Sequence, residues 1–377
     1  MIAIEHQYVE RSTGAIRTEQ LVADGFIRWL YAREREEPGR LMRALTSRRF
    51  TRLLGALRYD LYLGNRRTCG LTLLRQLGAD PAECLDDPQT LDSPRKVFER
   101  RIRYWEVRPL PGPETVVVSP ADSRVLLVSL DPDSLLFLKE KFFTLDELLG
   151  PAAGPWRERF HHADGAVFRL TPDKYHYNHL PVSGRVVAFY EIEGACHSCN
   201  PFALVRAAGL HAKNRRAITV IDTDVPGGSR AGLVIMVEVV ALMIGEVVQC
   251  YSDERYDHPR PVEAGMFLRR GAPKSLFRPG SSTVVLLFER GRVAFDPDLT
   301  RNQARVDVQS RFSAAFGHPQ VETDLAVRSS LGLARPPRRI ALPGRPAPFR
   351  EASPVGEAVA HVPRSSLETV LQPIGHE

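Results

Sequence analysis

The sequence lacks an uninterrupted apolar run long enough to cross a bilayer, which takes about 20 residues. Its most apolar stretch, residues 233–248, is broken by Glu238 and Glu246, and its Val and Ile content is typical of buried strands. The first residues also lack the charged start and apolar block of a secretory signal. We therefore expect any membrane contact of this chain to be peripheral.

Cysteine is scarce as well, with five residues at the irregularly spaced positions 69, 84, 196, 199 and 250. An odd number at such spacings argues against a disulfide framework and for a reducing compartment. Cys196 and Cys199 form a CxxC pair. A zinc site takes a second pair of ligands and a redox motif takes a βαβ setting, and the sequence provides neither. We therefore predict no metal site.

The composition is that of a globular protein: 377 residues, 43% hydrophobic and 25% charged. Lysine and arginine total 51 against 45 acidic residues, a formal net charge of +6. A basic face suits an anionic bilayer or nucleic acid, although an arginine-rich proteome produces the same excess. Because no nucleic-acid-binding motif accompanies the charge, we predict no nucleic-acid partner.

From about residue 19 to residue 62 the apolar residues recur at helical spacing, which predicts two or three amphipathic helices. The residues that carry this pattern are Phe26, Trp29, Leu30, Leu41, Leu45, Leu53, Leu54 and Leu57. Arginines accompany them at positions 40, 43, 48, 49, 52 and 58. This basic face suits anionic lipid headgroups. It is equally compatible with a solvated face over an ordinary core.

After Pro109 the sequence pattern changes to short runs rich in β-branched residues and bounded by Pro, Gly, Asp and Ser, which predict strands. Examples are TVVVSP, SRVLLVSL, GRVVAFYEI, AITVIDTD, GLVIMVEVV and STVVLLFE. The predicted fold is α+β, with N-terminal amphipathic helices followed by a mainly antiparallel β region. We divide the chain into a helical region (1–108), a β-rich catalytic domain (109–332) and a Pro/Arg-rich disordered tail (333–377).

Three islands of reactive residues stand at strand ends or turns: Ser119 to Asp122, Asp173 to Pro181, and Gly280 to Thr283. Such Asp, His and Ser residues are the components of a charge-relay triad. By composition alone this is weak, because any chain of this length contains many such triples. The sequence also has no GxSxG elbow to mark a hydrolase nucleophile.

In their order, these islands resemble the phosphatidylserine decarboxylase family, with its SPxDG turn, its YHRxHxPxxG segment and its GST or GSS processing site. HQYVERSTGAIRTEQLVADGFIRWLY resembles the start of the shorter bacterial group. VFERRIRYWEVRPL, GLVIMVEVVALMIGEVV and VETDLAVRSSLG resemble further family segments, and residues 271–283 align without a gap. The likeness runs from about residue 7 to about residue 332.

The resemblance implies a self-cleaving proenzyme, or zymogen. Ser282 attacks the preceding carbonyl, the chain breaks between Ser281 and Ser282, and Ser282 becomes a pyruvoyl cofactor at the start of an α chain, leaving a β chain of residues 1–281. The pyruvoyl group then serves as an electron sink for decarboxylation, as pyridoxal phosphate does. His179, oriented by Asp122, is the candidate base, and His176 or His179 returns a proton to the carbanion.

The chain departs from the family pattern at several positions. Serine replaces the usual glycine at Ser123, Ser275 and Ser281, while Tyr177 and Pro279 replace the usual arginine and aromatic residue. Glycine permits backbone conformations that serine resists, so Ser281 is expected to slow processing. The double serine also permits Ser281 as the nucleophile. We favour Ser282, because a shift of one residue turns the side chain to the other strand face.

The resemblance implies conversion of phosphatidylserine to phosphatidylethanolamine and carbon dioxide. It also implies a homodimer on an anionic phospholipid surface, in the cytoplasm and peripheral to the inner face of the cell membrane. Two alternatives stay open: decarboxylation of a free amino acid with the same cofactor, and a lipid-binding relative that no longer processes itself.

Overall fold

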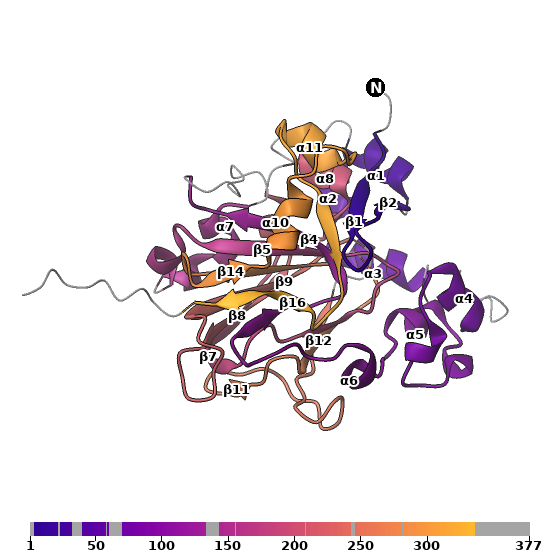
Figure 1. The fold of residues 1–377 in the computed structure, drawn as a ribbon. Coiled ribbons are helices and arrows are strands. Elements are labelled where there is room, and N and C mark those ends of the chain that lie inside the picture. Colours follow the sequence, from indigo (N-terminus) through magenta and orange to yellow (C-terminus); the bar gives the residue numbers. More distant parts are fainter. Residues whose placement is uncertain are drawn as a thin grey trace, which may run out of the picture. The chain divides into compact units, whose positions relative to one another are not determined.

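The structure is a computed structural model (Figure 1). It describes residues 4–21, 23–31, 40–57, 59, 70–132, 143–154, 156–207, 209–242, 246–280 and 282–335. All of these belong to the first of the chain's two units, residues 1–337. The disordered tail predicted from residue 333 lies outside the described residues, apart from its first three positions, two of which end strand β16.

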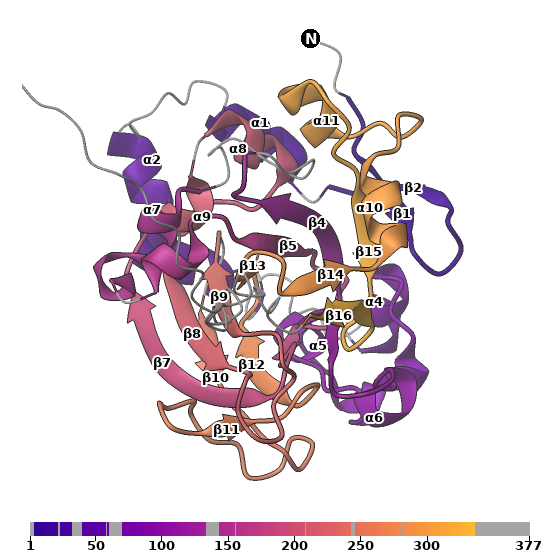
Figure 2. The ribbon, with the colours of Figure 1, turned by 60° about the vertical axis from the view of Figure 1, so that its left-hand side comes forward.

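A ten-stranded sheet forms the centre of the fold, and its neighbouring strands are antiparallel except for β1 and β15. In spatial order it contains β11 (Phe267–Leu268), β7 (Gly184–Ile192), β8 (Arg216–Asp222), β9 (Leu233–Val240), β13 (Ser282–Phe288), β5 (Asp164–Leu170), β4 (Ser123–Ser129), β15 (Glu322–Leu325), β1 (Gln7–Glu10) and β2 (Ile16–Thr18). Figure 2 shows the long strands β7 and β8 side by side.

Two three-stranded sheets complete the β structure. The first, which we call the small sheet, contains β10 (Val247–Gln249), β12 (Pro273–Phe277) and β6 (Tyr177–His179). The second contains β14 (Val293–Phe295), β16 (Ser330–Ala334) and β3 (Val116–Val118). The small sheet carries one of the reactive islands, since β6 contains His179.

The helices are short. They are α1 (Asp24–Tyr31), α2 (Arg40–Leu45), α3 (Arg48–Gly55), α4 (Leu71–Gln76), α5 (Pro94–Phe98), α6 (Tyr104–Val107), α7 (Leu145–Leu149), α8 (Pro201–Arg206), α9 (Leu210–Lys213), α10 (Pro297–Gln303) and α11 (Arg311–Phe316). Single 3-10 turns span Pro81–Glu83, Pro88–Thr90, Pro151–Ala153 and Arg157–Phe160. Figure 1 shows α1, α8 and α11 gathered at one end of the molecule. Among the described residues, no helix has the length and apolarity that crossing a bilayer requires.

The central strands of the large sheet are buried on both faces, whereas the edge strand β2 is exposed. Along β13, Val285 and Leu287 pack into one apolar cluster, while Val284, Leu286 and Phe288 pack into another. A strand covered on both faces needs apolar side chains at every position, which explains the continuous run VVLLF. Each of the six runs predicted as strands contains a strand of the structure, and the predicted α+β class is confirmed.

The N-terminal region contains the short helices α1, α2 and α3 within residues 19–62, together with a hairpin that the sequence did not predict. The amphipathic character of these helices stays a prediction. Strand β1 of this hairpin pairs in parallel with β15, so residues near both ends of the described chain share one sheet. Helix α1 buries Ile27 and leaves Phe26 and Trp29 exposed by 44% and 62%. The proposed domain boundary at residue 108 stays a prediction.

Candidate active site

Ser282 is the first residue of the central strand β13, where it pairs with Leu170 of β5 and Val240 of β9. Its hydroxyl is buried and has no hydrogen-bond partner among the described residues. The turn before it contains Gly280 at φ 152°, a conformation that side-chain-bearing residues rarely adopt. Ser281, the predicted residue on the other side of the cleaved bond, lies outside the described residues.

Asp122 immediately precedes β4 and is buried. Its Oδ1 accepts a hydrogen bond of 2.7 Å from the backbone N–H of Val327. The guanidinium of Arg108 lies 3.4 Å from its Oδ2. Burial opposes ionisation, but the positive charge of Arg108 and the Val327 N–H together lower the pKa of this carboxyl. Asp122 is therefore an ionised carboxylate at neutral pH.

His179 lies on β6 next to the segment that contains Asp122, because its backbone N–H donates to the carbonyl of Pro120 at 2.7 Å. Its ring Nδ1 is 2.9 Å from the carbonyl of Gly271, which can only accept, so Nδ1 carries the proton. Nε2 then accepts from the Tyr175 hydroxyl at 3.0 Å. Burial lowers the pKa of His179 to about 3, so its ring is neutral at pH 7.

Tyrosines surround this histidine. The Tyr175 and Tyr256 hydroxyls are 2.7 Å apart, and the Tyr256 oxygen also accepts from the backbone N–H of Ile102 at 3.2 Å. The Tyr256 hydroxyl also donates to the backbone carbonyl of Ile102 at 2.9 Å. The ring of Tyr104 meets that of His179 edge-on at a centroid distance of 4.7 Å. The sequence analysis did not single out these tyrosines, because residues 104, 175 and 256 meet only in the folded chain.

His176 precedes β6 and is fully buried. Its ring stacks on Phe98 at a centroid distance of 3.5 Å, and neither ring nitrogen has a well-aligned hydrogen-bond partner among the described residues. Burial, together with the nearby charge of Arg100, holds the pKa of His176 well below its usual value. Phe98 in turn meets Tyr59 at 6.0 Å, and Tyr59 lines the cavity described below.

The structure places Asp122 and Ser282 at the same end of the strands of the large sheet, and His176 and His179 before and on β6 of the small sheet. It does not join them in one hydrogen-bonded triad. Arg124 of β4 and Thr283 of β13 both pair with Arg169 of the intervening β5. Asp122 and Ser282 therefore stand at the starts of two strands that run in the same direction, two strand spacings or about 10 Å apart. The Ser282 hydroxyl bonds to neither histidine, and Nε2 of His179 is engaged by Tyr175.

A cavity of about 570 Å³ borders the turn before Ser282 at Gly280. Its walls are mainly apolar and come from α1, α3, the end of β5 and the start of α8. Phe26 and Leu57 line it, and each is exposed by 44%, which places an opening of the cavity at the protein surface. Arg169 and Glu19 supply charge to the lining.

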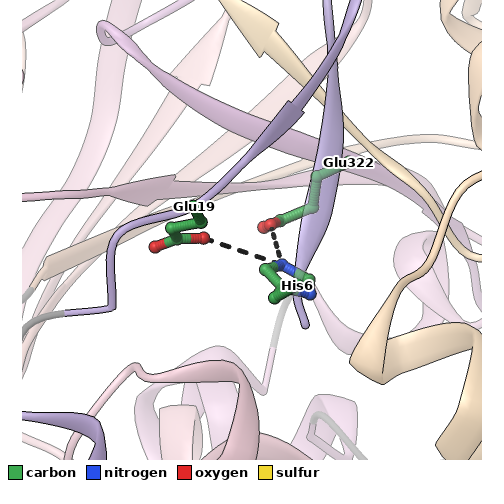
Figure 3. Close-up of side chains that lie close together, drawn as sticks. All are labelled: His6, Glu19 and Glu322. Carbon is green, nitrogen blue, oxygen red and sulfur yellow. Dashed lines mark hydrogen bonds and ion pairs between the residues drawn. The ribbon is translucent and has the colours of Figure 1, made fainter. Parts of the chain in front are cut away.

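His6, Glu19 and Glu322 lie close together beside this cavity and could in principle ligate a metal (Figure 3). Their carboxylates are instead neutralised by arginine. Arg169 donates to Glu19 Oε1 at 2.9 Å and to Glu322 Oε1 at 2.9 Å, and Arg124 lies 2.6 Å from Glu19. Two guanidinium groups balance two carboxylates, so the cluster is an ion-pair network. A cation could enter only by displacing an arginine.

Two of the departures from the family pattern are compatible with the local backbone. Ser123 and Ser275 both lie in strands and have no positive φ, so neither position requires glycine. The Ser275 hydroxyl donates to Glu238 and accepts from Asn178 at 2.9 Å, contacts that glycine cannot make.

The sequence matches the family described as phosphatidylserine decarboxylase over residues 95–314, more than half of the chain. A phosphatidylserine decarboxylase proenzyme from Chlamydia trachomatis is 28% identical over 324 residues, 84% of this chain and 98% of the relative. A proenzyme of the same name from Fusobacterium nucleatum is 25% identical, covering 83% and 97% of the two chains. A third, from Clostridium tetani, is 25% identical, covering 78% and 91%.

These matches define a carboxy-lyase, an enzyme that removes a carboxyl group as carbon dioxide. The chain belongs to the phosphatidylserine decarboxylase family.

Proposed function

We propose that this chain is a proenzyme that cleaves itself between Ser281 and Ser282 and then decarboxylates phosphatidylserine to phosphatidylethanolamine. The observation that supports this most is the state of Ser282. Its hydroxyl is buried and has no hydrogen-bond partner in the part of the chain that the structure describes, at the start of the central strand and directly after a turn in which Gly280 has a φ of 152°. A buried hydroxyl without a partner is costly, which favours a functional role for it.

Self-cleavage would proceed in three steps: rearrangement of the peptide bond to an ester, elimination, and hydrolysis. The Ser282 Oγ attacks the carbonyl carbon of residue 281, and the C–N bond breaks to leave an ester and a free amine at position 282. Loss of the Cα proton of residue 282 breaks its Cβ–Oγ bond and releases residue 281 as a carboxylate. The remaining unsaturated amine takes up water and releases ammonia, which leaves a pyruvoyl group.

The residues around Ser282 supply the acid and base groups for this chemistry. His179 is neutral and its Nε2 carries a lone pair, so it can take the serine proton once it exchanges its partner Tyr175 for Ser282. The ionised Asp122, held beside the same β6 segment, stabilises the imidazolium that results. His176, buried and neutral, stacks on Phe98, which meets the cavity-lining Tyr59, and is proposed, with His179, for returning a proton to the product.

The pyruvoyl group supplies an electron sink for an amine-bearing substrate. The cavity beside Gly280 suits the apolar part of an amphiphile, because its lining is mainly apolar and opens between Phe26 and Leu57. The side chains of Arg43, Arg49 and Arg52 are exposed on the same helical region. We propose that this face rests on anionic lipid, at the inner face of the cell membrane. The homodimer stays a prediction.

The test is turnover on lipid vesicles. Purified protein is incubated with vesicles that contain phosphatidylserine, and we expect release of carbon dioxide and formation of phosphatidylethanolamine. The Ser282→Ala protein is expected to stay uncleaved and to release none. Release of carbon dioxide from free amino acids, with none from vesicles, would favour the alternative in which the substrate is a free amino acid. Wild-type protein that remains a single band at 42.2 kDa would contradict self-processing.

The membrane face makes a separate prediction. Replacing Trp29, exposed by 62%, with serine is expected to weaken binding to phosphatidylserine vesicles about 10-fold, because burial of such a side chain in the interface is worth at least 1.4 kcal/mol. Vesicle co-sedimentation measures this. The matched control is Val306→Ser, since Val306 is exposed by 87% but lies after α10. An equal loss in both variants would contradict a membrane face at α1.

A further inference from the structure

A buried ion pair joins the large sheet to the small sheet directly beside the cleavage turn. Glu238 of β9 and Lys274 of β12 are both fully buried, and Lys274 Nζ lies 2.6 Å from Glu238 Oε2. We infer that Glu238 and Lys274, with the polar groups around them, form a positioning network that holds the cleavage turn and sets the rate of self-cleavage. This inference rests on the self-processing proposed above.

All three strands of the small sheet converge on the Glu238 carboxylate. From β6, Asn178 donates to Oε1 at 3.1 Å, and from β10, Gln249 donates to Oε2 at 2.9 Å. From β12, Lys274 bonds to Oε2 and the Ser275 hydroxyl donates to Oε1. Lys274 also donates to Gln249 at 2.8 Å, so the cation itself is held from two strands.

These contacts tie together the segments on both sides of the cleaved bond. Strand β12 ends at Phe277, and only residues 278–281 separate it from Ser282. On the C-terminal side of the cleaved bond, strand β13 pairs with β9: Ser282 lies opposite Val240, and Val284 lies opposite Glu238. Glu238 and Ser282 are therefore diagonal neighbours. Because strand side chains alternate, both face the same side of the sheet, at roughly 7–8 Å between backbones.

The same network fixes the segment that carries the histidines, since Asn178 lies between His176 and His179. A carboxylate in an apolar core is costly unless every lone pair is satisfied and a counter-charge is present. Glu238 meets both conditions only when β6, β10 and β12 occupy these positions. The network therefore penalises any displacement of β12, and with it any displacement of Gly280 and Ser282 from the geometry that attack on the carbonyl requires.

The inference predicts a kinetic signature that a purely structural role does not. In Lys274→Met, the Glu238 carboxylate is left in the core without its counter-charge, and burial favours its protonated form. We expect self-cleavage to slow on the order of 100-fold at pH 8, and to recover as the pH falls and Glu238 takes up a proton. Among the described residues, Cys250 interacts electrostatically with both members of the pair, and the charge of Arg278 also acts on Cys250. Its thiol pKa is raised to about 12, chiefly by burial, so it stays protonated throughout this range.

The experiment follows the 42.2 kDa precursor converting to two fragments on a denaturing gel after synthesis in a cell-free system, from pH 6 to pH 9. Glu238→Gln/Lys274→Met removes both charges and is expected to cleave without the new pH dependence. The remote control is Arg11→Met, which removes a cation from Asp296 and Asp298 at β1 and α10, and is expected to cleave at the wild-type rate.

The outcomes separate this inference from the proposal beneath it. A wild-type chain that never cleaves contradicts the proposed function, whatever the variants do. A wild-type chain that cleaves at Ser282, with Lys274→Met cleaving as fast and with the same pH profile, overturns the network's role. If Lys274→Met fails to fold, the Ser275→Ala variant tests the role of the network instead. It removes the hydrogen bonds of the Ser275 hydroxyl to Glu238 and Asn178 and keeps both charges. Slower cleavage supports the network, and cleavage at the wild-type rate refutes it.

Discussion

At the scale of single residues, the buried His176, His179 and His197 share one property, a ring that burial keeps neutral. His179 and His197 have pKa values lowered to about 3 and about 4, chiefly by burial, and the pKa of His176 is also well below its usual value. A neutral imidazole is what a general base requires, and burial provides it here without a neighbouring cation in hydrogen-bond contact.

This burial predicts a loss of stability in mild acid. Below pH 6.5 these histidines gain a proton in the unfolded chain but not in the folded one, until the pH approaches their lowered values. The free energy of unfolding should therefore fall between pH 6.5 and pH 4, by roughly 1.4 kcal/mol per pH unit for each histidine. Denaturant unfolding of the uncleaved Ser282→Ala protein measures the slope.

His176→Phe isolates one contribution to that slope. Phenylalanine keeps the stack on Phe98 and removes no well-aligned side-chain hydrogen bond among the described residues. We expect a stability at pH 7.5 within about 1 kcal/mol of the parent and a slope lower by roughly 1.4 kcal/mol per pH unit. An unchanged slope would show that His176 is already protonated, or exposed, in the folded protein.

The residue scale is also where prediction from sequence reaches its limit. Asp122, His176, His179 and Ser282 could be selected because they stand in short motifs. Glu238 could not be recognised as a network centre, since its partners Asn178 and Lys274 lie 60 and 36 positions away in the chain. It reads in sequence only as a charge interrupting an apolar run. The partners of a buried charge become visible only when the strands are paired.

At the scale of elements, strands with a strong local pattern were predictable and strands defined by their partners were not. β4, β8, β9 and β13 are continuous apolar or β-branched runs. The hairpin of β1 and β2 has no such pattern, and β1 gains its place from parallel pairing with β15, more than 300 residues away. The ion-pair network around Glu19 and Glu322, which Figure 3 shows with His6, makes the same connection with side chains. Arg169 of β5, which the figure does not draw, bonds to Glu322 of β15 and to Glu19 after β2.

Removing Arg169 should show how much this network contributes. Arg169→Met leaves Glu19 and Glu322 buried with less counter-charge, and we expect a loss of about 3–5 kcal/mol in the free energy of unfolding at pH 8. The loss should shrink towards pH 5, because protonation relieves the unpaired carboxylates. Unfolding of the Ser282→Ala background at both pH values measures it.

The matched control replaces a cation of the protein surface. Arg17 pairs with Glu10 at 3.1 Å, and the arginine side chain is 54% exposed. Arg17→Met is expected to cost no more than about 1 kcal/mol, as exposed pairs do, with no such pH dependence. Equal losses in both variants would contradict the view that burial makes the Arg169 network strong.

At the scale of the whole molecule, self-cleavage would divide the chain, while strands of the two fragments would stay hydrogen-bonded in one sheet. The α chain carries β13 to β16, and within the large sheet β13 lies between β5 and β9 while β15 lies between β4 and β1. Among the described strands, five pairings join the two fragments without any covalent link: β13 with β5, β13 with β9, β15 with β4, β15 with β1, and β16 with β3.

The fragments should therefore remain one particle after cleavage. Native mass spectrometry or gel filtration is expected to show them together in buffer and apart only in denaturant. Fragments that separate in buffer, under conditions where the uncleaved Ser282→Ala protein stays folded, would mean that the strand order of the precursor does not persist after cleavage.

The central claim concerns the bond between positions 281 and 282, and intact mass spectrometry of the purified protein tests it most directly. The predicted result is an α chain that begins at position 282, lighter by one ammonia than a chain with an N-terminal serine and heavier after reduction with borohydride. An α chain that begins at position 281, or a single uncut chain of 42.2 kDa, would contradict it.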